Sequence, residues 1–153
     1  MNSKLPLATL IELAQSKSDE ATRRLGQLQT AHASAAEKLN LLHQYRQEYL
    51  DQLEVHLHDG VSAAHLHNFH QFISTLDTAI EQQHALASQA DTRLAHGRSD
   101  WQHTKRRLNS FDTLADRFQQ QEVAALNQRE RRDSDEHTAR QFYLRTSTAI
   151  EQI

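Results

Sequence analysis

The sequence predicts an all-α protein: a long antiparallel two-helix coiled-coil hairpin, with a longer second helix that overhangs at the C-terminus. Three observations predict this fold. Two uninterrupted heptad runs fill most of the 153 residues, a single Asp59-Gly60 pair separates them, and helix breakers are scarce, with one proline and three glycines. A sustained spacing of three and four residues keeps an apolar stripe on one side of a helix, where a second stripe can cover it.

The first heptad run begins just after Pro6. Proline has no backbone N–H, and the first turn of a helix tolerates it because N–H groups there have no partner within the helix. Of its fifteen positions, eleven are apolar or aromatic. The run passes through Leu7, Ile11, Ala14, Ser18, Ala21, Leu25, Leu28, His32, Ala35, Leu39, Leu42, Arg46, Tyr49, Leu53 and His56. We expect helix over about residues 6–57, with these side chains, including His32 and His56, directed inward.

The second run has eighteen positions, fourteen of them apolar. It passes through Leu66, Phe69, Ile73, Leu76, Ile80, Gln83, Ala87, Ala90, Leu94, Gly97, Trp101, Thr104, Leu108, Phe111, Ala115, Phe118, Glu122 and Ala125. We expect helix over about residues 62–145.

The connection between the runs predicts a tight reversal at about residues 58–61. Gly60 accepts a left-handed backbone, Ser62 is a candidate N-cap, and Val61 and Leu66 occupy the two positions of a hydrophobic staple. Facing residue numbers then sum to about 121, as short helix-helix connections require. Residues 1–153 therefore form one coiled-coil domain, in which everything after about Ala115 has no partner within the chain.

Composition limits the function. With 37% hydrophobic and 24% charged residues, the chain can fill one narrow seam but not a wide core. It has no cysteine, no phosphate-binding glycine loop and no catalytic motif, so we expect no enzyme and no cofactor. Thr9 and Glu12 interrupt the N-terminal segment before it reaches the length of a signal peptide or membrane span, which predicts a soluble, cytosolic protein.

Phe72, Leu76 and Ala79 form a second apolar stripe that is turned partly outward. Either Phe72 folds back over the edge of the seam, or the stripe is a docking surface, because an exposed aromatic with apolar neighbours commonly anchors an interface.

Histidines and basic residues form two further groups. Five of the eleven histidines flank the turn (His56, His58, His65, His67 and His70), and a solvated, pH-responsive tip is favoured over a metal site because ligand-spaced carboxylates are lacking. Lys105, Arg106 and Arg107 form a short basic cluster, but acidic residues nearby leave too small a net charge to favour nucleic acid.

Several segments together resemble the flagellar export protein FliJ family. The most specific is the block from Phe69 to Gln82, FHQFISTLDTAIEQ, and the resemblance covers roughly residues 5–120. Supporting segments are Leu7 to Leu10, Tyr45 to Tyr49, Lys105 to Leu108 and Thr113-Leu114.

The resemblance implies a two-helix coiled coil similar to the stalk of rotary ATPases. It implies a noncatalytic adaptor, peripheral at the cytoplasmic face of the inner membrane, that binds the hexameric ring of the export ATPase FliI, the export gate FlhA and export chaperones. The gate-binding patch maps onto Phe72, Leu76 and Ala79. Separately, we expect the ring contact at Lys105, Arg106, Arg107 and Phe118. The alternatives are a structural coiled coil that self-associates into a four-helix bundle, and a weak nucleic-acid-binding or metal-binding hairpin.

Overall fold

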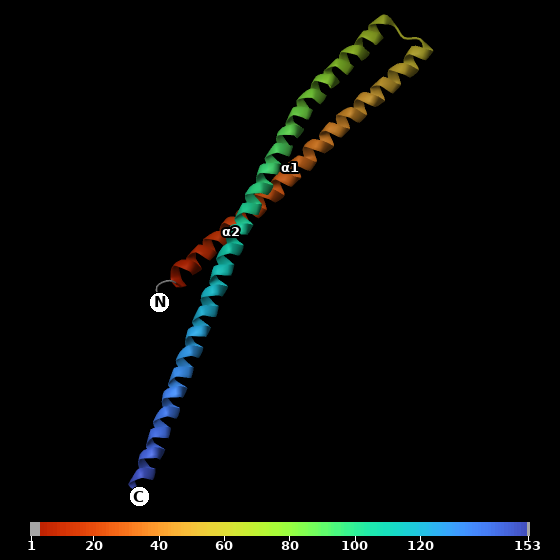
Figure 1. The fold of residues 1–153 in the computed structure, drawn as a ribbon. Helices are drawn as coiled ribbons and strands as arrows, with labels where there is room; N and C mark the ends of the chain where they lie inside the picture. The colour runs from red at the N-terminus through yellow and green to blue at the C-terminus, as the bar shows by residue number, and fades with distance from the viewer. Residues whose placement is uncertain (1–3, 153) are drawn as a thin grey trace. The chain divides into compact units, whose positions relative to one another are not determined.

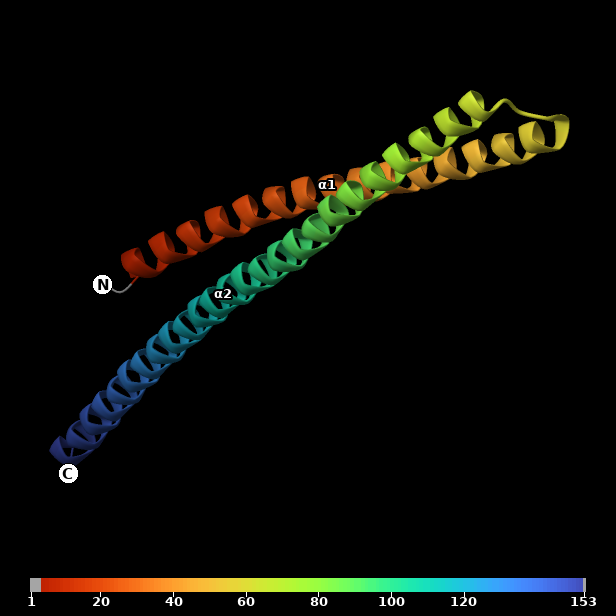
Figure 2. The same ribbon diagram turned by 90° about the horizontal axis from the view of Figure 1, so that it is seen from above.

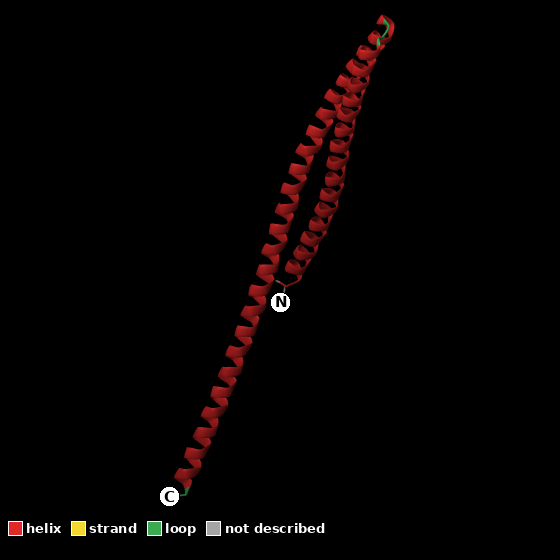
Figure 3. Cartoon of the chain, turned by 90° about the vertical axis from the view of Figure 1, so that its right-hand side faces the viewer, coloured by secondary structure: helices red, strands yellow, loops and turns green. Residues whose placement is uncertain are grey.

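The computed structural model describes residues 4–152, and nearly all of them are helical. Helix α1 spans Lys4–Asp59 and helix α2 spans Ala63–Glu151 (Figure 1). Within the described residues there is no β-strand, and loop is confined to the short connection and the last residue (Figure 3). The predicted all-α helical hairpin is confirmed.

Both helices extend beyond the ranges that the sequence predicts. Helix α1 starts two residues before Pro6 and still keeps this proline in its first turn, where the missing N–H costs no hydrogen bond. Helix α2 continues to Glu151 because nothing from residue 146 to that point breaks a helix.

Packing divides the chain into two units. One is Leu13–Arg106, and the other combines the described parts of residues 1–12 and 107–153. Each helix runs through both units, since α1 and α2 are continuous. The single domain expected over residues 1–153 stays a prediction.

In the unit Leu13–Arg106, the two helices run antiparallel on either side of the connecting loop (Figure 2). The buried and half-buried positions of α1 follow the predicted heptad run as far as Leu53. In α2 they follow the second run from Leu66 to Thr104 in the same way. Near the loop, Leu53, Phe69 and Ile73 form a buried apolar cluster. The core is therefore one seam between two helices.

The reversal has the geometry expected from its residues. Gly60 adopts a φ of 93°, a left-handed conformation that favours glycine. The Ser62 hydroxyl accepts a hydrogen bond of 3.2 Å from the N–H of His65, which is the N-cap interaction predicted for α2. The N–H of Leu66 donates to the Ser62 carbonyl at 3.0 Å and so closes the first helical turn.

Several polar contacts cross the seam and fix the pairing of the helices, among them an approach of His32 Nε2 to Asp91 Oδ1 at 3.4 Å. Arg46 Nε donates to Asp77 Oδ1. The Gln83 side-chain amide donates to the Ala35 carbonyl at 3.1 Å, and Trp101 Nε1 donates to the Thr22 hydroxyl at 3.0 Å. The paired residue numbers fall within one helical turn of the predicted sum, so the predicted register is correct in this unit.

The two helical glycines of this unit have different surroundings. A Cβ placed on Gly97 would overlap Leu28 Cδ1, whereas one placed on Gly26 would meet nothing within 4 Å. The helices therefore approach closely at Gly97, where only glycine fits without a shift of Leu28. Gly26 is exposed and lines the outer surface.

Ser18 is a polar residue inside the seam. It is 1% exposed, and its hydroxyl has no hydrogen-bond partner. A buried hydroxyl without a partner loses its hydrogen bonds to water and forms none within the protein. This position therefore destabilises the helix pair.

In the other unit, the start of α1 packs against a short part of α2. Leu7 and Ile11 are half-buried, as are Phe111 and Ala115 on α2. From Asp116 to Gln152 every residue is exposed. Within the described residues, no helix is long and apolar enough to cross a membrane.

Candidate partner-binding surfaces

Phe72 is the exposed member of the predicted outward stripe. It is 41% exposed, and its ring lies over the Tyr49 ring with centroids 4.1 Å apart and planes inclined by 32°. Phe72 thus leans over the edge of the seam and still presents one face of its ring to solvent. The sequence did not indicate the support from Tyr49, because the heptad pattern assigns Tyr49 to the seam and says nothing of its rotamer.

The other two residues of the stripe lie deeper. Leu76 is only 7% exposed and belongs to the seam, and Ala79 is half-buried. One turn along α1 from Tyr49, Arg46 is joined to Asp77 across the helices, with both side chains partly exposed. The surface therefore consists of the exposed Phe72, the half-buried Tyr49 and one ion pair, with the buried Leu76 one turn along α2 from Phe72. We call these five residues, Arg46, Tyr49, Phe72, Leu76 and Asp77, the aromatic patch.

The histidine tip is an aromatic cluster. His56 is exposed at the end of the seam, although its ring is directed towards α2 as predicted. Its ring lies 5.6 Å from that of His65 and 5.5 Å from that of Phe69. Among the described residues, no group of three or more metal-ligating side chains is gathered as a metal site would require.

The residues predicted to contact an ATPase ring are divided between the two packing units, and their surroundings differ between these units. In the unit Leu13–Arg106, Lys105 is half-buried and Arg106 is exposed. In the other unit, the Arg107 guanidinium lies 5.8 Å from the centroid of the Phe111 ring, a cation–π arrangement. Phe118 is exposed beside a hollow that is also lined by Leu7, Ile11 and Ala115.

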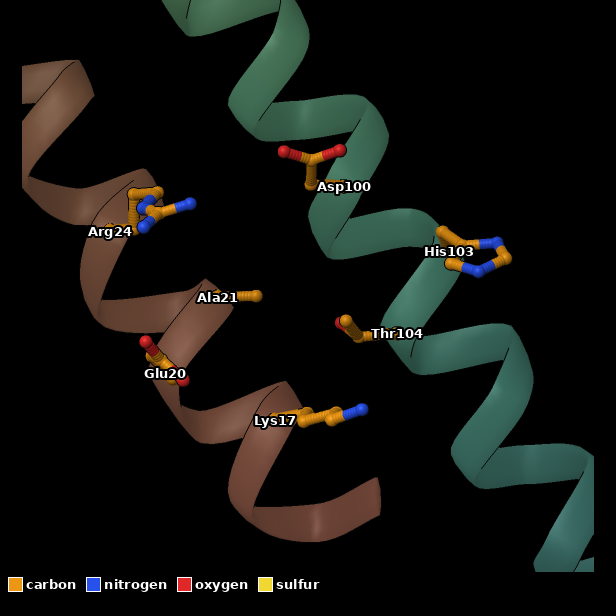
Figure 4. A pocket seen from close by; sticks show the side chains of 7 residues that line it. All are labelled: Lys17, Glu20, Ala21, Arg24, Asp100, His103 and Thr104. Carbon is orange, nitrogen blue, oxygen red and sulfur yellow. The ribbon is translucent and has the colours of Figure 1, made fainter. Parts of the chain in front are cut away.

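A groove that sequence patterns did not indicate lies farther along the seam. Figure 4 shows it between the two helices, with Ala21 and Thr104 facing one another across the gap. It is lined by Lys17, Glu20, Ala21, Arg24, Asp100, His103 and Thr104. The small side chains at the centre leave the space. Its charges are mixed, so the groove favours neither an anion nor a cation.

The exposed part of α2 carries large apolar side chains in two places. Val123 and Leu126 lie near its beginning, and Phe142, Tyr143, Leu144 and Ile150 near its end. We call residues 116–152 the tail of α2. Between its two apolar ends lies a run of charged residues, 129–140, in which Arg140 approaches Glu136 to 4.0 Å.

Comparison with known proteins agrees with these features. The family model described as "Flagellar FliJ protein" matches residues 3–147. The flagellar FliJ protein of Salmonella typhi is 32% identical over 134 residues, which cover 88% of this chain and 91% of that protein. The flagellar FliJ protein of Escherichia coli strain K12 is 31% identical over the same coverage. Because the match extends over almost the whole two-helix chain, this protein belongs to the flagellar FliJ family.

Proposed function

We propose that this protein is a noncatalytic stalk and adaptor of flagellar type III export that binds the ring of the export ATPase FliI, docks on the export gate FlhA and contacts export chaperones. Its membership in the flagellar FliJ family makes it a component of the flagellar export apparatus. The assignment of partners to surfaces is the proposal.

The observation that carries the proposal is the exposure of the whole tail. The tail is helical as far as Glu151, and all of its residues are exposed. It includes aromatic and aliphatic side chains at both ends. When a second protein covers the apolar side chains of an amphipathic helix, their removal from water lowers the free energy of the system and so favours binding. We therefore assign the ATPase-ring contact to the tail, starting at Phe118.

The basic residues Lys105, Arg106 and Arg107 supply charge next to the start of the tail in sequence. Arginine and lysine side chains at the rim of an interface accelerate association with an acidic surface more than they strengthen the final complex. In this proposal they steer the ATPase ring towards the helix, and Phe118 provides the apolar contact. Chaperones bind the apolar side chains near the end of the tail.

The aromatic patch is the proposed gate-binding surface. Its Phe72 ring offers exposed apolar area at a fixed position, since the Tyr49 ring supports its other face. Aromatic anchors of this kind often dominate the binding energy of an interface. Leu76 supports the patch from below, and Ala79 leaves room for the partner's backbone.

Two variants separate the two contacts. Phe72→Asp removes the aromatic anchor, and we expect it to weaken FlhA binding by about thirtyfold, as for the loss of one interface anchor. It should leave the stimulation of FliI ATP hydrolysis unchanged. Phe118→Asp should have the opposite effects, with reduced stimulation and normal FlhA binding.

The measurements are the FliI ATPase rate with and without this protein, and FlhA binding by isothermal titration calorimetry. Circular dichroism checks that both variants stay helical, which we expect because both side chains are exposed. If neither protein binds the wild-type chain, the adaptor function is wrong. If one variant weakens both contacts, the separate assignment of the two surfaces is wrong.

A further inference from the structure

The charges of this chain are unevenly distributed, and acidic residues dominate the part of the hairpin around the turn. Residues 39–92 contain seven aspartates and glutamates and a single basic residue other than histidine, Arg46. With neutral histidines, this segment carries a net charge of −6, whereas the rest of the chain carries +3, with sixteen basic and thirteen acidic residues. We call residues 39–92 the acidic segment. It lies wholly in the unit Leu13–Arg106, as does the aromatic patch.

Contacts within the hairpin leave most of this negative charge uncompensated. Arg46 is joined to Asp77, and the other six acidic side chains of the segment form no salt bridge with a lysine or arginine of the described residues. Asp51 accepts a hydrogen bond of 3.0 Å from the Gln47 side chain, which is neutral. Glu48 and Asp51 lie one helical turn apart, so their carboxylates repel one another. A basic group from another molecule would relieve this repulsion.

The exposed aromatic ring shares one flank of the hairpin with part of this charge. Glu48 directly precedes the seam residue Tyr49, and Phe72 holds the equivalent position before the seam residue Ile73. Positions of this kind on two antiparallel helices lie on the same flank of the seam. The Tyr49 ring, whose centroid is 4.1 Å from that of Phe72, lies between them in this arrangement. Glu48 and Asp51 are both exposed.

We propose that the aromatic patch binds a partner protein in which lysine and arginine side chains surround the apolar pocket that receives Phe72. Glu48 and Asp51 would face these basic side chains. The exposed ring marks the site, and the carboxylates on its flank define the chemistry of the partner. The inference rests on the gate contact proposed above, and it adds that the docking site on the gate is basic.

The charge also excludes other classes of partner. Acidic protein surfaces, nucleic acids and anionic membranes are repelled by a segment of net charge −6. A second copy of this chain is a poor match, because its basic residues outside the acidic segment alternate with almost as many acidic ones. A separate protein with a basic rim is therefore the occupant that the charges favour.

Charges at the rim of an interface act mainly on the association rate, and salt screens them. The apolar contact of Phe72 contributes instead to the dissociation rate. The two contributions are therefore separable by kinetics.

The test measures association and dissociation rates of the full chain with FlhA at salt concentrations from about 50 mM to about 500 mM. We expect the double variant Glu48→Lys and Asp51→Lys to associate at least about tenfold more slowly than wild type at the lowest salt, with dissociation changed by less than about threefold. At the highest salt the two association rates should approach one another.

A matched double variant, Asp19→Lys and Glu37→Lys, provides the control. It changes the total charge by the same amount, and both residues are exposed on α1 outside the acidic segment. Glu37 lies about 16 Å along the helix from Glu48, which exceeds the Debye length at 0.1 M salt. We expect this control to slow association by less than about twofold. Circular dichroism checks that both double variants stay helical.

The possible outcomes separate this inference from the gate contact itself. If FlhA binds the wild-type chain at a rate that neither salt nor the double variant at Glu48 and Asp51 changes, the inference is wrong and the gate contact stands. Equal slowing by both double variants would assign the effect to total charge and would also overturn the inference. If FlhA does not bind the wild-type chain, the gate contact is wrong and the inference falls with it.

Sedimentation of the chain alone at low salt tests the remaining occupant. We expect no self-association that depends on Glu48 and Asp51. A wild-type chain that self-associates, and that becomes monomeric when both residues are replaced by lysine, would make a second copy the partner of this flank. That result would overturn the proposal.

Discussion

The seam of the unit Leu13–Arg106 and the tail of α2 follow the same three-four spacing, yet their side chains have opposite surroundings. Phe69 in the seam is 7% exposed, whereas Tyr143 on the tail is 74% exposed. The spacing determines only which side of the helix is apolar. Burial depends on whether another helix lies opposite, and among the described residues none covers the tail.

The largest expected difference between the two regions is the effect of removing an aromatic ring. Phe69→Ala should lower the free energy of unfolding by about 3–5 kcal/mol, since it leaves a cavity in the apolar cluster near the loop. Phe142→Ala should change it by less than about 0.5 kcal/mol at low protein concentration, because the ring is exposed. Urea denaturation followed by circular dichroism measures both. Equal losses would mean that the tail is covered within the monomer.

A smaller difference is expected between the two helical glycines. Gly97→Ala should destabilise the helix pair by about 1–3 kcal/mol, because the new methyl group overlaps Leu28 Cδ1. Gly26→Ala should stabilise it by up to about 1 kcal/mol, since the site is open and alanine is the better helix former. Thermal unfolding midpoints give the sign of each change. A stabilising Gly97→Ala would show that Leu28 moves aside at no cost.

Ser18→Ala should stabilise the chain by about 1 kcal/mol, since it removes a buried hydroxyl that has no hydrogen-bond partner. Ser34→Ala is the matched control: it sits on the exposed side of α1 and should give only the few tenths of a kcal/mol that helix propensity supplies. Urea midpoints for the two variants separate the contributions. If both gain equally, the hydroxyl of Ser18 is hydrated in solution.

The smallest effect is expected at the Arg46–Asp77 ion pair. Both side chains are more than one-third exposed, so Asp77→Asn should cost less than about 1 kcal/mol in spite of the close contact. The loss should shrink further in 1 M salt, where the charges are screened. Denaturation at low and high salt measures this difference. A loss that is independent of salt would mean that the pair acts through its hydrogen bond alone.

Much of the fold could be predicted because its determinants are local and periodic. The heptad positions from Leu7 to Leu53 and from Leu66 to Ala115 are all buried or half-buried, and the turn at Gly60 and the cap at Ser62 follow from residue types. His56 follows the pattern in that its ring lies against His65 and Phe69 of α2, but it is exposed because it lies at the end of the seam.

The details of the candidate surfaces could not be predicted in the same way. The stacking of Phe72 on Tyr49 and the hydrogen bond from Trp101 to Thr22 depend on side-chain rotamers that a heptad pattern leaves open. The groove beside Ala21 depends on which small side chains of the two helices lie near one another, and a heptad pattern does not specify this. The proposed gate and ring contacts stay predictions, because they concern partners that no intrachain contact reveals.

The close approach of Gly97 to Leu28 restricts how this protein can change in length. Both residues are tied to the same turn at Gly60, so deleting a few residues from one arm alone would move a larger side chain opposite Leu28. Only matched deletions or insertions of whole heptads in both arms keep the glycine in place. The length of the hairpin between its turn and this point is therefore expected to vary among related proteins in steps of seven residues per arm. The tail, which has no such counterpart, is free to vary by single residues.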